Sequence, residues 1–101
     1  MSVNASLSIQ ILPQVPEKDA VIKIVDLIID YIKSTGLTYM VCPYETTIDG
    51  DFEQLMDIFA QCQKICVENG SPFSLTYAKI MYKPDTSGIW TIDDKVGKHH
   101  K

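Results

Sequence analysis

The sequence lacks arginine, since all nine of its basic residues are lysines. A guanidinium group that binds phosphate, carboxylate or guanine through two parallel hydrogen bonds is therefore excluded. Thirteen acidic residues bring the formal net charge to −4 at pH 7, whereas proteins that bind nucleic acid usually present a basic face. The composition thus disfavours nucleic-acid binding and weakens any phosphate-handling function.

Long apolar runs are also missing. No stretch approaches the ~20 apolar residues that a membrane-spanning helix needs, and the chain does not open with the basic and then apolar residues of a secretory signal. Three cysteines, an odd number, are typical of reduced thiols in the cytoplasm when no signal is present. We expect a soluble cytoplasmic protein with a single domain over residues 1–101, of which 97–101 form a disordered tail.

Histidine is confined to His99 and His100, within that predicted tail, so a Cys–His or Ser–His catalytic pair is not supported. Cys62 and Cys66 lie four residues apart, but no second pair completes a zinc site, and we interpret them as buried apolar groups. The sequence therefore predicts no catalytic residue, no metal site, no cofactor and a non-enzymatic role. An enzymatic alternative would need Glu45 as its general base.

Apolar residues alternate with polar ones from Val3 to Ile11, which predicts a strand with two different faces. Helical spacing predicts a helix over 17–34, with Pro16 in its first turn and Gly36 at its end. The apolar stripe of this helix is widened by Ile22, Leu27, Ile29 and Tyr31, so packing against one face of a sheet would leave part of the stripe uncovered. Two strands are then expected over 37–42 and 44–48, separated by Pro43.

Asp49 and Gly50 are predicted to form a turn, after which Asp51 caps a second helix that ends at 69–70, with Gln54 reaching back to the cap. Its predicted buried stripe consists of Phe52, Leu55, Met56, Phe59, Cys62 and Cys66. A fourth strand is expected over 74–82, followed by a short strand or helical turn that packs through Ile89, Trp90, Ile92 and Val96.

The order strand, helix, strand, strand, helix, strand predicts an α+β protein. Two split βαβ units give the ferredoxin-like βαββαβ fold, a four-stranded antiparallel sheet with two helices on one face. A short C-terminal extension follows.

One face of such a sheet remains open. Side chains alternate between the two faces along a strand, so the odd or even position of a residue, here called its parity, assigns it to one face. The residues expected on the open face are Ser6, Ser8, Gln10, Glu45, Thr47, Leu75, Tyr77, Lys79 and Met81. The residues expected toward the helices are Ala5, Leu7, Ile9, Thr76, Ala78, Ile80 and Tyr82, and Thr46 and Ile48 share the face of their strand opposite to Glu45 and Thr47.

The open face supports two interpretations. Leu75, Tyr77 and Met81 would form an apolar patch of the kind that marks association, so the face is either a plain homo-oligomer interface or an interface that also holds a ligand pocket. In the second case the serine and threonine hydroxyls supply donors, Glu45 an anionic acceptor and Tyr77 an aromatic wall.

The segment Gly36–Glu53 carries the pattern Gly-x-x-Tyr…Pro-x-x-Thr-Thr-x-acid-Gly. Together with Ser8 and the ending Gly88–Val96, it resembles the small thiamine-binding proteins of bacteria and archaea, and the resemblance covers nearly the whole chain. It implies a ferredoxin-like homotetramer, made of dimers paired through their sheets, that binds thiamine (vitamin B1) or its hydroxymethylpyrimidine half without established catalysis. The implied site lies near Ser8 and Thr47.

The candidate ligand-binding set is Ser6, Ser8, Glu45, Thr46, Thr47 and Tyr77. Hydroxyls of Ser8 and Thr47 and the Glu45 carboxylate would read the aminopyrimidine edge, and Tyr77 would stack on a ring. Lys79, if it points into the pocket, would disfavour a cation and serve an anionic ligand or pair with Glu45. The expected role is vitamin salvage, transport or sensing. The alternative is a structural or regulatory homo-oligomeric module without a small-molecule ligand.

Overall fold

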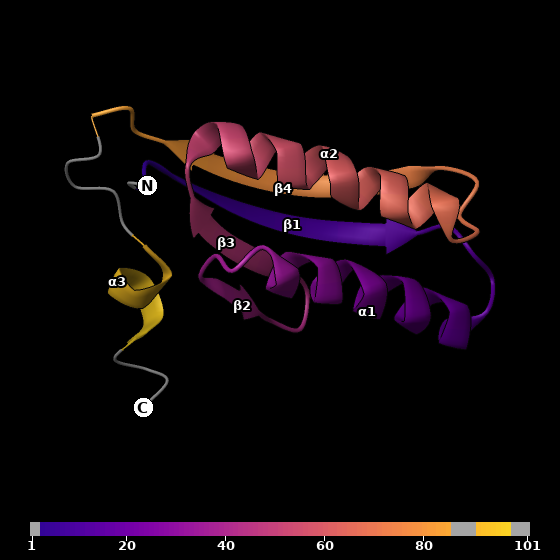
Figure 1. Ribbon diagram of the computed structural model, residues 1–101. Helices are drawn as coiled ribbons and strands as arrows, with labels where there is room; N and C mark the ends of the chain where they lie inside the picture. Colours follow the sequence, from indigo (N-terminus) through magenta and orange to yellow (C-terminus); the bar gives the residue numbers. More distant parts are fainter. Residues whose placement is uncertain (1–2, 86–90, 98–101) are drawn as a thin grey trace.

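The computed structural model of the protein describes residues 3–85 and 91–97. The elements follow the chain as β1 (Ala5–Pro13), α1 (Lys18–Ser34), β2 (Tyr39–Val41), β3 (Thr46–Gly50), α2 (Phe52–Glu68), β4 (Ser74–Tyr82) and α3 (Ile92–Val96). The strands form one sheet in the order β2, β3, β1, β4, and every neighbouring pair is antiparallel. Helices α1 and α2 run side by side across one face of the sheet (Figure 1). The predicted ferredoxin-like fold is confirmed.

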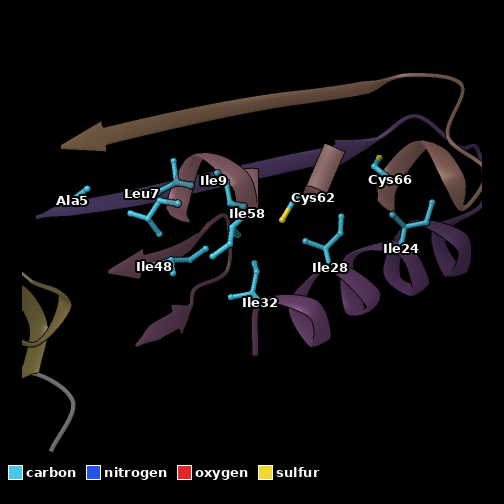
Figure 2. Packing of buried hydrophobic residues seen from close by; sticks show 11 residues of the cluster. Ala5, Leu7, Ile9, Ile24, Ile28, Ile32, Ile48, Ile58, Cys62 and Cys66 are labelled. Atoms are coloured by element: carbon cyan, nitrogen blue, oxygen red, sulfur yellow. The ribbon is translucent and has the colours of Figure 1, made fainter. Parts of the chain in front are cut away.

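The core lies between the helices and the sheet (Figure 2). Strand β1 contributes Ala5, Leu7 and Ile9, which alternate with polar residues as the sequence pattern predicts. The buried residues of the two helices are Ile24, Ile28, Ile32, Leu55, Ile58, Cys62 and Cys66. Ile58 was missing from the predicted stripe of α2, and Met56, which was included, is only partly buried. Burial of these side chains is the main stabilising term, about 1.5–3 kcal/mol for each large residue.

The predicted bounds of the two short strands were wrong. The Cys42 N–H donates to the Glu45 carbonyl at 2.8 Å, which closes a tight connection and leaves 42–45 outside both strands. The predicted turn at Asp49 and Gly50 is instead the extended end of β3. There the Asp49 N–H donates to the Thr38 carbonyl at 3.0 Å, so β3 continues to the residue before α2.

The helix starts also differ in detail. Helix α1 begins after its N-cap Glu17, so Pro16 precedes the helix and does not occupy its first turn. Asp51 caps α2 as predicted by accepting from the backbone of Glu53 and Gln54. The Gln54 side chain does not complete a capping box, because its Oε1 is buried without a partner in the described chain.

The described part of the C-terminal extension packs on the end of β3, where Asp49 Oδ2 accepts from the Ile92 N–H at 2.8 Å. Ile92 is buried, as expected of a helical turn that packs on its neighbour. Ile89, Trp90 and the predicted tail from 98 onward lie outside the described residues. Across the described ranges, no helix has the length and apolar character needed to span a bilayer.

Candidate functional site

A row of four side chains crosses the open face of the sheet. Ser8 of β1 pairs with Thr47 of β3 on one side and with Lys79 of β4 on the other, and Thr47 pairs with Met40 of β2. Paired residues in antiparallel strands point to the same face. The row therefore places Lys79 across from the Ser8 hydroxyl, on the side that parity predicted.

Hydrogen bonds join the two hydroxyls of this row to a carboxylate. Thr47 Oγ1 donates to Ser8 Oγ at 3.4 Å, and Ser8 Oγ donates to Glu45 Oε2 at 2.6 Å. Glu45 precedes β3 directly, held by the hydrogen bond from Cys42. The short bond to a carboxylate is the stronger of the two. These two hydrogen bonds fix the orientations of the Thr47 and Ser8 hydroxyls. The second Glu45 oxygen accepts no hydrogen bond from a described residue and is therefore available to an external partner.

These side chains line a hollow of about 330 Å³ in the open face, hereafter the sheet hollow. Its lining residues are Ser6, Ser8, Glu45, Thr47, Lys79, Ile80 and Met81. The structure thus brings together four of the six predicted site residues and adds a lysine. No ion pair joins Lys79 to Glu45 among the described residues. The hollow therefore offers a cation, a carboxylate and hydroxyls to the same bound molecule.

Two predicted site residues lie elsewhere. Tyr77 is on the open face opposite Gln10, 63% exposed, but does not line the sheet hollow. Thr46 points the other way, toward the helices, because consecutive strand residues alternate between faces. The structure therefore separates Thr46 from Thr47.

Thr46 belongs to a second space of about 190 Å³, hereafter the helix cleft, between α1 and the segment that connects β2 to β3. Its lining residues are Ile9, Gln10, Ile11, Leu12, Val25, Ile28, Ile29, Ile32, Val41, Cys42, Pro43, Tyr44, Glu45 and Thr46. The cleft exists because β2 and β3 are shorter than α1 and β1. Sequence reasoning did not find this cleft, although the wide apolar stripe of α1 was a signal that a surface beyond the sheet needed cover.

The cysteines of α2 are part of the core. Cys62 and Cys66 are fully buried, as interpreted from the sequence, and burial raises the pKa of the Cys62 thiol to about 12. Cys62 is therefore a neutral apolar group at physiological pH. In residues 3–85 and 91–97, no cluster of three or more histidine, cysteine or acidic side chains is arranged to hold a metal ion.

The comparisons with known proteins agree over nearly the whole chain. The family model for thiamine-binding proteins matches residues 7–100. The chain belongs to the thiamine-binding protein family. A UPF0045 protein of Clostridium perfringens is 42% identical over 96 residues, which cover 95% of this chain and 97% of that protein.

Solved structures of similar proteins have the same fold as this member of the thiamine-binding protein family. A Bacillus cereus domain of unknown function, DUF77, is 36% identical with a TM-score of 0.84, over 100% of this chain and 94% of that one. A Thermotoga maritima protein with a suggested role in thiamine biosynthesis or salvage is 31% identical with a TM-score of 0.80, over 95% of this chain and 98% of that one. Family and neighbour together support a thiamine-related role.

Proposed function

We propose that this protein binds thiamine or its hydroxymethylpyrimidine half without converting it, in the salvage, transport or sensing of the vitamin in the cytoplasm. The observation that carries the proposal is the family match over residues 7–100. The sheet hollow adds chemical support, because its hydroxyls and carboxylate are arranged as a connected set.

Thiamine joins a neutral aminopyrimidine to a cationic thiazolium. A cation is favoured near the free oxygen of Glu45, and the hydroxyls of Ser8 and Thr47 offer donors and acceptors to polar groups of the ligand. Lys79 on the opposite side of Ser8 disfavours the cation and favours an anionic substituent. The proposed contacts are thus Ser6, Ser8, Glu45 and Thr47, with Tyr77 outside the hollow on the same face.

We place this site at a subunit interface, in a tetramer of dimers paired through their sheets. The support is the exposure of Leu75, Tyr77 and Met81 on the open face, since contiguous exposed apolar side chains mark association surfaces. The same observation favours a second candidate function, a homo-oligomeric interaction module without a ligand. Native mass measured with and without thiamine distinguishes them, because an interaction module keeps the same mass and binds no vitamin.

The direct test is Thr47→Val, which keeps the side-chain shape and removes the hydroxyl. We expect thiamine binding, measured by isothermal titration calorimetry, to weaken by about 1–3 kcal/mol because a ligand group loses its partner. Thr38→Val, at an exposed threonine outside the sheet hollow, is the control. Unchanged affinity for Thr47→Val would remove this residue from the site.

A further inference from the structure

The helix cleft contains a polar group that no described residue satisfies. Thr46 is only 9% exposed, and its hydroxyl forms no hydrogen bond with any described residue. The Thr46 hydroxyl oxygen is not fully enclosed, unlike Asp49 Oδ1 and Gln54 Oε1, which are enclosed and have no partner among the described residues. Since Thr46 lines the cleft, its hydroxyl is open to that space. A ligand in the cleft exchanges the bond of this hydroxyl to water for a bond to the ligand, and a ligand without a matching polar group would leave the hydroxyl unpaired.

The cleft also contains an unpaired strand edge. The Asp49 N–H of β3 donates to the Thr38 carbonyl, and the Glu45 carbonyl just before β3 accepts from the Cys42 N–H, so these odd-numbered residues direct their backbone toward the β2 side. The even-numbered residues of β3, including Thr46, therefore direct their backbone groups toward β1. The pairing between β1 and β3 ends at Thr46, the first residue of β3, which lies opposite Ile9. The next β1 residue whose N–H and C=O point to this side is Ile11, and it has no partner in β3. Ile11 therefore presents a donor and an acceptor side by side at the cleft.

The shape and walls of the cleft define the class of ligand. Pockets for drug-sized molecules measure about 300–1,000 Å³, whereas this cleft of about 190 Å³ has room for a single ring. Val25, Ile29 and Pro43 provide apolar walls, which suit the two faces of a planar ring. An aminopyrimidine carries a ring nitrogen acceptor beside an exocyclic amine donor, the complement of the Ile11 backbone pair.

We infer that the helix cleft binds the aminopyrimidine ring, with Thr46 and the Ile11 backbone reading its polar edge. This inference rests on the proposed function and assigns the two halves of thiamine to different places. Glu45 lines both spaces. When the pyrimidine ring of thiamine occupies the cleft, the cationic thiazolium would therefore lie beside Glu45, toward the sheet hollow. The arrangement differs from the sequence expectation, in which Ser8 and Thr47 read the pyrimidine edge.

Adjacent threonines on opposite faces of β3 provide a matched pair of variants. Thr46→Val and Thr47→Val remove the same hydroxyl from the helix cleft and the sheet hollow respectively. Hydroxymethylpyrimidine, which lacks the thiazolium, is titrated into each variant by calorimetry. We expect Thr46→Val to bind it about five- to 150-fold more weakly than the wild type, and Thr47→Val to lose less affinity than Thr46→Val. Thr38→Val, at an exposed threonine outside both spaces, should bind it as the wild type does.

A second variant tests the cleft if Thr46→Val does not fold. Val25→Phe fills the cleft from α1 and should abolish hydroxymethylpyrimidine binding, whereas Leu27→Phe, on the exposed side of the same helix, should not. Wild-type affinity in Thr46→Val or Val25→Phe, or an equal loss in Thr47→Val, would overturn the inference while the proposed function stands. A wild type that binds neither thiamine nor hydroxymethylpyrimidine would overturn both.

Discussion

Replacing Glu45 with glutamine separates the charge of the carboxylate from its hydrogen bonding. The amide keeps the size of the side chain and still accepts the bond that Ser8 donates at 2.6 Å. What it removes is a negative charge at the place where the two binding spaces meet. Thiamine carries a cation and hydroxymethylpyrimidine does not, so only thiamine should respond to the loss of charge.

The magnitude follows from Coulomb's law and from the exposure of the side chain. Two unit charges about 4 Å apart interact by ~1 kcal/mol in bulk water and by ~4 kcal/mol at the effective dielectric constant of a protein surface. Glu45 is partly exposed, and Lys79 in the same hollow offsets part of its field. We therefore expect Glu45→Gln to weaken thiamine binding by about 1–2 kcal/mol at low salt, and by less as salt screens the interaction.

Calorimetric titrations of both ligands into Glu45→Gln, at low and at physiological ionic strength, measure this difference. Glu68→Gln, at an exposed acidic residue of α2 away from both spaces, controls for the change in net charge. Unchanged thiamine binding, or an equal loss of affinity for the uncharged hydroxymethylpyrimidine, would refute a contact between Glu45 and the cationic half of thiamine.

Three further predictions follow from individual contacts. Lys79→Gln removes the cation of the sheet hollow, so calorimetry should show tighter binding of thiamine and weaker binding of thiamine monophosphate; a parallel change for both ligands would contradict this. Because burial raises the pKa of Cys62 to about 12 from an ordinary 9.0, the unfolded chain loses that proton first as the pH rises. The free energy of unfolding should therefore fall by ~1.4 kcal/mol per pH unit above that ordinary value, and urea titrations of Cys62→Ala at several pH values should lack this part of the slope. Asp51→Ala removes the acceptor that caps α2 and should lower the free energy of unfolding in urea by about 1 kcal/mol, whereas an unchanged midpoint would exclude the cap as a stabilising contact.

The fold was predictable because its strands and helices have clear periods. Strict alternation in β1 determined which residues face the helices, and the register of β1 with β3 and β4 then placed Ser8, Thr47 and Lys79 on one face. The bounds of β2 and β3 were not predictable from local pattern. Asp49 and Gly50 resemble a turn, but a backbone bond to Thr38 and the contact with Ile92 hold Asp49 extended and buried.

The sheet hollow could be predicted from parity, whereas the helix cleft could not. The cleft depends on where β3 ends relative to β1 and α1, and that point is set by the connection closed between Cys42 and Glu45. Alternation along the strand separates Thr46 from Glu45 and Thr47, so the inclusion of Thr46 and Thr47 in one candidate set combined residues from two faces. The structure assigns these neighbours to two different spaces.

Isothermal titration calorimetry of the ligand-free protein with thiamine tests the central claim most directly. We expect saturable binding with a dissociation constant of about 1 μM or below, equivalent to roughly −8 kcal/mol. The absence of any saturable heat from folded protein would contradict thiamine binding and leave the exposed sheet face as a protein-interaction surface.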